Sequence, residues 1–389
     1  MKELRIGLIG YQFMGKAHSF AYRNAAMFFD LPVKPVMEMI CGRSAAPLKA
    51  AQERFGWNRS CTDWKRLVGD PKIDMVDIAT PPNIHRDIAV AAAGEGKAVF
   101  CEKPLASTLK EAYEMAEAAE KHRIRHAVCF NYRKIPAIGF ARKMIEEGRL
   151  GKIYHMRAVY LQDWIMNPDF PLVWRLRKIV AGSGAHGDLN AHLIDMARYL
   201  VGEFEEVVGM HETFIKERPV LEKSSVLKTG LSERAKTAAR RGKVDVDDAS
   251  LFLARFTNGA VGSFEATRFA AGRKNGQRFE INGSRGSISF NLERLNELEY
   301  YNADDPEGTQ GFRTIIAMEP SHPYAGNWWP SGHIIGYGES FVNMVADVIT
   351  AVGRGKKASP DFWDGIRCQR VLEAVEQSVR DGKWARVGR

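Results

Sequence analysis

Short apolar runs alternate with stretches of helical periodicity along the first 130 residues of the chain. The apolar runs predict strands at Leu4–Ile9, Val36–Cys41, Met75–Ala79, Ala98–Cys101 and Ala127–Phe130. The stretches between them predict helices at Gly15–Ala26, Ala46–Phe55, Trp64–Val68, Ile84–Ala93 and Leu109–Lys121. Alternating strands and helices are typical of a parallel sheet, and continuous apolar strands indicate that both sheet faces are covered. We predict a doubly wound α/β domain over residues 1–130.

The hydrophobic pattern changes after about Asn131. Apolar and polar positions alternate with a period of two, as Phe252, Ala254 and Phe256 do, which is typical of an antiparallel sheet with one solvated face. Strands are expected at Ile153–Gln162, Glu205–Phe214, Ala249–Phe256, Gly262–Thr267, Gln277–Asn282 and Ser287–Asn291, and helices at Gly139–Glu147, Asp188–Leu200, Glu339–Val352 and Phe362–Arg380. Asn258-Gly259 is a hairpin signal between two of the strands. Residues 131–389 are therefore predicted to form an α+β domain on a large, mostly antiparallel sheet.

The segment Lys216–Asp248 interrupts this pattern. It is polar and basic with little apolar periodicity, so we predict a long loop or extension. The segment contributes to a net charge of +9 and a pI near 9.2. Because neither interleaved aromatic residues nor a nucleic-acid module accompany the charge, we interpret it as a solvated basic surface that could favour anionic ligands, and we expect no nucleic-acid partner.

Length and composition narrow the class of protein. A chain of 389 residues is longer than a single hydrophobic core usually organises, so two domains are expected. No stretch approaches the roughly 18 apolar residues of a membrane span, and the first residues leave no room for a signal peptide. The five cysteines are scattered and odd in number, which favours small buried side chains over a disulfide framework or a zinc site. We expect a cytoplasmic protein with no membrane partner.

The first predicted strand runs into a glycine-containing turn, Gly10-Tyr11-Gln12-Phe13-Met14-Gly15. A Gly-x-Gly-x-x-Gly turn at this place leads a strand into a helix whose N-terminus holds a pyrophosphate. Gln12 replaces the middle glycine and weakens the motif, but the position after the first strand supports a nucleotide site. Gly10, Gln12, Phe13 and Met14 are therefore candidate cofactor-binding residues.

Further candidates lie at the ends of the other predicted strands. The second strand ends in Arg43 and Ser44, where an NAD site often carries an acid. Arg43 could pair with a 2′-phosphate or stack on adenine, so both NAD and NADP stay open. The carboxyl-end loops of the third and fourth strands should face the ligand crevice of such a sheet. These loops supply Thr80, Pro81, Asn83, His85, Glu102 and Lys103.

Three motifs together resemble those of the Gfo/Idh/MocA oxidoreductases, a family named for glucose–fructose oxidoreductase and inositol dehydrogenase. They are the glycine turn, Glu102-Lys103-Pro104 and the stretch Gly187–Asp195, and their order spans most of the chain. Phe130–Arg133 and Gly336–Glu339 are similar to a branch with levoglucosan and other glucoside dehydrogenases. The resemblance implies an N-terminal Rossmann domain with a slight preference for NAD(H) over NADP(H). It also implies oxidation of a secondary hydroxyl of a sugar, glucoside or anhydrosugar.

The resemblance further implies that Lys103, Asp188 and His192 form the reactive cluster. Asp188 and His192 are four residues apart, so on a helix they project from one face. His192 is the best candidate base because imidazole accepts a proton near neutral pH, and Lys103 would stabilise the developing alkoxide. Asp188 would orient the substrate. Whether Lys103 or His192 formally takes the proton stays open.

Aromatic and polar side chains suited to a sugar pocket supply the remaining candidates. Asn131 and Arg175 are expected to contact the cofactor, and Arg175 could reach the substrate instead. The expected substrate contacts are Lys103, Tyr132, Asp163, Trp174, Asp188, His192 and Tyr337.

Other interpretations of the same residues stay open. His186-x-Asp188-x-x-x-His192 has the residue types of a zinc or iron site, but no second ligand cluster accompanies it, so we expect no metal. Asp245–Asp248 lacks the glycine and distal glutamate of a calcium loop, so we interpret it as an acidic turn before a strand. The alternative functions are a glycoside-processing enzyme that oxidises its sugar transiently with bound NAD, and a non-catalytic cofactor or sugar sensor. The sheet-rich second domain predicts a homodimer or homotetramer.

Overall fold

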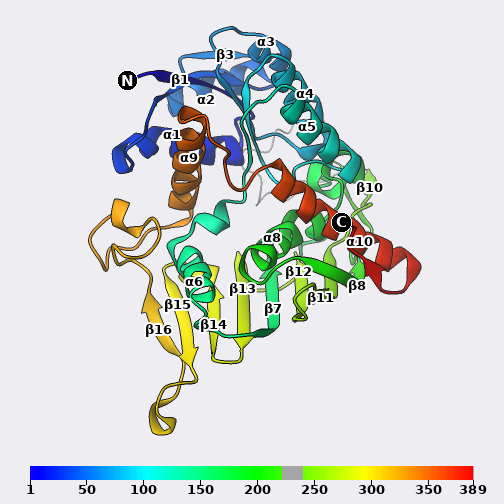
Figure 1. Ribbon diagram of the computed structural model, residues 1–389. Coiled ribbons are helices and arrows are strands. Elements are labelled where there is room, and N and C mark those ends of the chain that lie inside the picture. The colour runs from blue at the N-terminus through cyan, green and yellow to red at the C-terminus, as the bar shows by residue number, and fades with distance from the viewer. Residues whose placement is uncertain (221–239, 389) are drawn as a thin grey trace. The chain divides into compact units, whose positions relative to one another are not determined.

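The computed structural model describes residues 1–220 and 240–388 (Figure 1). The chain divides into two compact units, Met1–Lys134 with Gly336–Gln369, and Ile135–Ile335 with Arg370–Arg389. The hydrophobic pattern grouped Gly336–Gln369 with residues 131–389, whereas the structure packs this segment with the first unit. Among the described residues, no helix has both the length and the apolar character needed to cross a membrane.

The first unit is built on a six-stranded parallel sheet with strand order β3-β2-β1-β4-β5-β6. Its strands are β1 (Glu3–Ile9), β2 (Lys34–Cys41), β3 (Arg59–Cys61), β4 (Met75–Ile78), β5 (Ala98–Cys101) and β6 (His126–Val128). This is the strand order of a Rossmann domain, and it confirms the predicted doubly wound sheet. The three-residue strand β3 was not predicted, because so short a segment shows no periodicity.

Helices connect these parallel strands. They are α1 (Phe13–Phe28), α2 (Ala45–Phe55), α3 (Trp64–Val68), α4 (His85–Gly94) and α5 (Leu109–Lys121), with 3₁₀ turns at Pro82–Ile84 and Asn131–Lys134. Helix α5 begins at the predicted residue, and Thr108 and Glu111 form a capping box there. The later helix α9 (Tyr337–Gly353) packs against α1, and its Asn343 amide donates to the Lys134 carbonyl. This packing explains why the segment belongs to the first unit.

The second unit is built on a nine-stranded sheet with strand order β16-β15-β14-β13-β7-β12-β11-β8-β17. Its strands are β7 (Ile153–Leu161), β8 (Phe204–Glu212), β11 (Ala249–Phe256), β12 (Val261–Thr267), β13 (Gly276–Gly283), β14 (Gly286–Asn291), β15 (Glu297–Asn302), β16 (Arg313–Ile316) and β17 (Ala385–Arg386). Neighbouring strands are antiparallel except β7 and β12, which are parallel. The predicted large, mostly antiparallel sheet is confirmed, and so is the hairpin at Asn258-Gly259 between β11 and β12.

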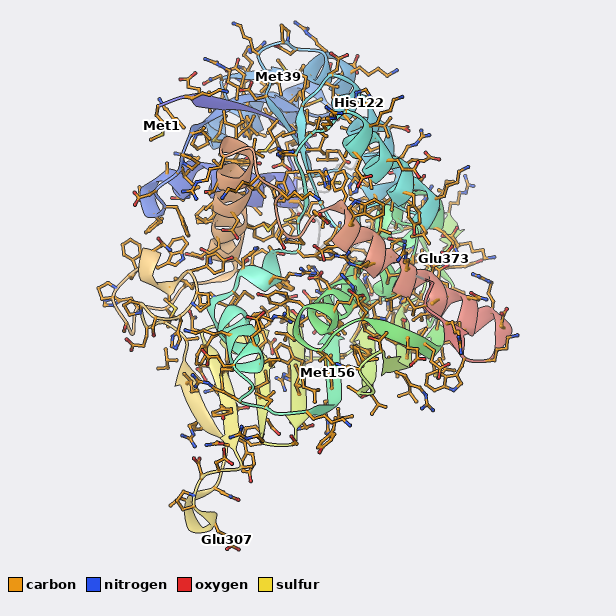
Figure 2. The ribbon with its side chains drawn as sticks, in the orientation of Figure 1. Met1, Met39, His122, Met156, Glu307 and Glu373 are labelled. Atoms are coloured by element: carbon orange, nitrogen blue, oxygen red, sulfur yellow. The ribbon has the colours of Figure 1, made fainter. Side chains whose placement is uncertain are left out.

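One face of the nine-stranded sheet carries α6 (Pro136–Glu146) and α8 (Ala191–Leu200) (Figure 1). Phe252, Ala254 and Phe256 of β11 are buried, as their alternation predicted, whereas Leu251 and Leu253 are exposed. Figure 2 marks Met156 on β7, which is also buried, and Glu307 at the exposed connection between β15 and β16. The remaining helical elements are α7 (Lys178–Ala181), α10 (Phe362–Asp381), and short turns at Trp174–Leu176, His186–Asn190, Leu292–Arg294, Glu307–Thr309 and Ala325–Asn327.

The segment predicted to be a long loop, Lys216–Asp248, contains two short strands within its described residues. They are β9 (Glu217–Pro219) and β10 (Arg241–Lys243), which pair in antiparallel fashion, while residues 221–239 lie outside the described residues. The interpretation of this segment as a solvated basic surface is wrong for Arg218, because the side chain of Arg218 is fully buried. Its guanidinium donates to the backbone carbonyls of Ile165 and Asn167, so this arginine stabilises the neighbouring loop.

Candidate active site

The turn between β1 and α1 depends on glycine at two positions. Gly10 has a φ of +114°, and a Cβ there would lie 2.3 Å from the carbonyl oxygen of Ala79. A Cβ on Gly15 would lie 2.2 Å from the carbonyl oxygen of Gly10. Gln12 instead has a φ of −81°, which any residue adopts. The backbone therefore explains why glutamine is tolerated where the motif usually has glycine.

The residues around this turn fit a dinucleotide. The strand order reverses between β1 and β4, and ligands of open α/β sheets bind at the carboxyl ends of the strands beside such a point. The 16-residue helix α1 begins at this point of the sheet, and in its first turn Phe13 is exposed and Met14 is half-buried. On the neighbouring strand end, the Thr80 hydroxyl oxygen is buried without a hydrogen-bond partner among the described residues. A glycine cradle, a helix N-terminus and an unpaired hydroxyl together suit a bound pyrophosphate.

The end of β2 offers an exposed basic and hydroxyl pair. Arg43 and Ser44 are both exposed, and the Ser44 hydroxyl caps no backbone group of α2. Glu38, the nearest acid, is buried and forms ion pairs with Arg5 at 2.9 Å and Arg59 at 2.7 Å. Glu38 is therefore occupied within β2, and Arg43 and Ser44 remain the groups at this strand end that a ribose or phosphate could meet.

Two predicted cofactor-binding residues have hydrogen-bond partners in the protein. His85 is buried, with Nε2 2.9 Å from the carbonyl oxygen of Thr80 and Nδ1 3.2 Å from that of Pro104. Burial lowers the pKa of His85. Its ring contacts link the loop after β4 to the loop after β5. The Asn131 side chain is buried as well and donates to the Ser340 hydroxyl at 2.8 Å. Pro81 is half-buried and Asn83 exposed on the loop after β4.

Lys103 directly follows a buried acid at the end of β5. Glu102 accepts the backbone N–H of Lys103 with Oε2 at 3.1 Å, and its Oε1 lies 2.8 Å from Nε2 of His18. The Lys103 side chain is half-buried. In the same unit, the Tyr337 ring lies 6.2 Å from the Phe13 ring and 6.4 Å from the Tyr132 ring, measured between centroids. The structure thus groups three predicted ligand-binding aromatic residues.

In the second unit, Asp188 lies in the turn just before α8, and His192 lies in the first turn of α8. Asp188 Oδ2 forms an ion pair with Arg268 Nη2 at 2.8 Å, and the Arg268 guanidinium lies 5.3 Å from the centre of the Trp164 ring. The His192 ring is buried, 5.9 Å from the Tyr160 ring. The predicted regular helix from Asp188 is wrong in its first turn, because His186–Asn190 form a π-helical turn before α8 begins at Ala191. Such turns are frequent at functional sites.

Protein groups occupy both ring nitrogens of His186. Nε2 lies 2.9 Å from the carbonyl oxygen of Leu372, and Nδ1 lies 3.1 Å from the Ser250 hydroxyl. The acidic run before β11 is also engaged with backbone: Asp247 accepts the N–H groups of Gly184 and His186, both at 2.7 Å. These carboxylate contacts anchor the π turn and favour the acidic-turn interpretation over a calcium loop.

Three further predicted contacts lie in the second unit. Asp163 pairs with Lys274 at 2.7 Å and accepts the Gly272 N–H, and the Lys274 hydrogen bond lowers the pKa of its carboxyl group. The Arg175 guanidinium lies 4.3 Å from the centre of the Trp174 ring. Burial lowers the pKa of Arg175 while the charge of Asp188 opposes this shift, which puts Arg175 within electrostatic reach of Asp188.

Sequence reasoning missed Arg268 and Tyr160 and gave His18 no role. The alternation of β12 could have indicated Arg268. Phe264 and Ala266 are buried, and Arg268, two residues further on, lies on the same face. Tyr160 follows Met156 and Ala158 on the buried face of β7 in the same way. The contacts of these side chains join distant strands and helices, which local spacing does not reveal.

Comparison with known proteins bears on both units. Residues 4–130 match the family described as the oxidoreductase family with an NAD-binding Rossmann fold, and residues 139–289 match the GFO/IDH/MocA C-terminal domain. Levoglucosan dehydrogenase of Pseudarthrobacter phenanthrenivorans is 45% identical over 100% of this chain and 99% of its own.

Solved structures agree with these matches. A levoglucosan dehydrogenase in complex with NADH and levoglucosan superposes with a TM-score of 0.93 at 44% identity, covering 100% of both chains. An oxidoreductase domain protein from Kribbella flavida gives 0.93 at 48% identity with the same coverage. The NAD-binding fold and the sugar dehydrogenase relatives confirm the predicted NAD(P)-dependent sugar dehydrogenase and support NAD as its cofactor, and the chain belongs to the Gfo/Idh/MocA oxidoreductase family.

Proposed function

We propose that the chain oxidises a secondary hydroxyl of an anhydrosugar of the levoglucosan type. The observation that carries this proposal is the 45% identity to levoglucosan dehydrogenase over the full length, through both units. The candidate residues support it: Lys103 follows β5 in the first unit, while Asp188 in the π turn before α8 and His192 in the first turn of α8 belong to the second.

His192 is the proposed general base for the hydroxyl proton. Its ring is buried against the sheet beside Tyr160, so its orientation is restricted before substrate binds. Lys103 would donate to the reacting oxygen and stabilise the alkoxide as the proton leaves. Asp188, held by Arg268 at 2.8 Å, would accept a hydrogen bond from a neighbouring sugar hydroxyl. Bound NAD supplies the acceptor for the hydride.

We expect Gly10, Gln12, Phe13 and Met14, at the turn into α1, to contact the cofactor. Residues at the ends of the other strands of the parallel sheet would supply the remaining contacts. Arg43, Ser44, Thr80, Pro81 and Asn83 would contact the cofactor directly. The buried His85, Glu102 and Asn131, together with Arg175, are the remaining cofactor candidates. Tyr132, Asp163, Trp174 and Tyr337 would complete the substrate pocket, since aromatic faces pack against the C–H surfaces of sugars.

A panel of anhydrosugars, glucosides and polyols, read by NADH absorbance with NAD and NADP in parallel, tests the proposal. We expect levoglucosan or a close analogue to give steady NADH production. His192→Ala and Lys103→Ala should each lower kcat by about 10²–10⁴-fold without loss of folding. His155→Ala, a partly exposed histidine on β7, is the matched control and should stay within about twofold. Sugar turnover without net NADH would point to transient oxidation instead, and a folded His192→Ala protein with normal transfer would refute the mechanism.

We also propose that the chain assembles as a dimer or tetramer through the nine-stranded sheet. Met210, Leu251, Leu253 and Val261 are exposed on neighbouring strands of that sheet, which is typical of a face that another subunit covers. A cytoplasmic location fits the five cysteines, which are all buried and form no disulfide within the described residues.

A further inference from the structure

Buried polar side chains from three elements of the first unit form a chain that the proposed reaction does not use. His18 lies on α1, Asp77 on β4 and Glu102 directly after β5, and their exposed fractions are 0%, 0% and 5%. The His18 ring places Nδ1 2.8 Å from Asp77 Oδ2 and Nε2 2.8 Å from Glu102 Oε1. The Tyr22 hydroxyl donates to the same Asp77 oxygen at 2.8 Å. Three elements that are distant in sequence thus meet at one imidazole.

The geometry determines the charge of this imidazole. An ionised carboxylate only accepts hydrogen bonds, so a ring with an ionised carboxylate at each nitrogen must carry a proton on both. Burial opposes a charged ring, but the charge and hydrogen bond of Asp77, with contacts to Cys129 and Glu102, raise the pKa of His18 well above its ordinary value. Burial also opposes ionisation of Glu102, yet His18 and the charge of Lys103 lower its pKa. The result is a buried carboxylate–imidazolium–carboxylate bridge.

A metal site is the other arrangement these residue types could form. His18, Glu102 and Cys129 are the one such group of potential ligands within the described ranges, with Cys129 Sγ 3.8 Å from His18 Nε2. Burial raises the pKa of the Cys129 thiol, so the sulfur stays protonated and is a poor ligand. Both nitrogens of His18 already face carboxylate oxygens, and the Phe100 and Phe341 rings pack against the imidazole. The contacts favour the hydrogen-bonded bridge.

The bridge bears directly on Lys103. Glu102 uses one carboxylate oxygen for His18 and the other for the backbone N–H of Lys103, at 3.1 Å. On the far side of the same turn, Nδ1 of His85 lies 3.2 Å from the carbonyl oxygens of both Pro104 and Leu105. The backbone on each side of Lys103 is therefore held by a buried histidine, by His18 through Glu102 on one side and by His85 on the other. Loss of the His18 imidazole would leave the buried carboxylates of Asp77 and Glu102 without their shared partner.

We propose that His18 is a positioning residue: its imidazolium holds Glu102 and thereby fixes the turn that presents Lys103 to the substrate. The inference rests on the role proposed for Lys103. Through α1, the same imidazolium connects the helix that begins at the glycine turn to the turn that carries Lys103. A shift of about 1 Å in a catalytic group can cost about 10²-fold in rate, so a residue that touches no ligand can still control the reaction.

A double-mutant cycle between His18→Gln and Lys103→Ala tests this proposal. Single-turnover hydride transfer is measured at saturating NAD, with NADH affinity and melting temperature measured on the same samples. In the parent protein, His18→Gln should slow transfer by about 10- to 100-fold, with NADH affinity changed by less than about threefold. In the Lys103→Ala background, His18→Gln should slow hydride transfer by less than about threefold. His126→Gln, a histidine of the same unit that accepts the Phe362 N–H, is the matched control and should leave the rate unchanged.

Each outcome of the cycle has a distinct meaning. Equal losses in the two backgrounds would overturn the positioning role, because a merely structural effect does not depend on Lys103. No effect of Lys103→Ala alone would refute the proposed function instead. If His18→Gln does not fold, nitrogen-15 spectra of the histidine-labelled parent holoenzyme decide the matter. We expect one histidine to keep both ring nitrogens protonated at a pH where an ordinary imidazole has lost its proton, and its absence would overturn the inference.

Discussion

The ion pair between Arg268 and Asp188 offers a quantitative test of how the second unit holds a catalytic candidate. The two side chains are 2.8 Å apart, with exposed fractions of 1% for Arg268 and 33% for Asp188. Opposite charges about 4 Å apart attract by about 4 kcal/mol at an effective dielectric constant near 20. Because water reaches a third of Asp188 and burying Arg268 costs solvation energy, the net coupling should be about 1.5–3 kcal/mol.

The assay is a double-mutant cycle of Arg268→Met and Asp188→Asn, with the free energy of unfolding measured in urea. The cation–π contact of Arg268 with Trp164 is lost in both the single and the double variant, so it cancels from the coupling. Arg255 and Glu206 are the matched control pair, 3.0 Å apart on the same sheet with exposed fractions of 59% and 28%. Their coupling should be about 0.2–1 kcal/mol. A coupling below about 0.5 kcal/mol for Arg268 and Asp188 would refute the reasoning.

Three further predictions follow from other features. Arg43→Asp should weaken NADP binding more than NAD binding, measured by nucleotide fluorescence, and equal losses would show that Arg43 meets no 2′-phosphate. Because the pKa of His18 is raised on folding, its contribution to stability is complete below about pH 6.5 and is lost as pH rises through the native pKa. The melting temperature of the parent should therefore fall more steeply than that of His18→Gln on the alkaline side, and parallel curves would contradict this. Light scattering at micromolar concentration should show a dimer or tetramer, and Leu253→Glu should weaken that assembly; a monomeric parent would remove the proposal.

The hydrophobic pattern predicted most strands and helices because each has a face or a run of apolar residues long enough to show its period. It missed β15 and β16 near one edge of the sheet, where the alternation is masked by exposed residues such as Ile316. The candidate site was predicted from motifs at strand ends, whose place in a parallel sheet follows from topology. The partners of those residues, such as Arg268 for Asp188, were not predictable, because they meet only through tertiary packing.

The π turn at His186–Asn190 adds one residue to the backbone just before α8. Deleting Leu189 would allow a continuous α-helix with unbroken backbone hydrogen bonds, and it would bring Asp188 from four residues before His192 to three. Both spacings place two side chains on one face of an α-helix, so their shared face does not depend on the π turn. The additional residue instead changes where on that face Asp188 lies, and therefore where its carboxylate meets Arg268.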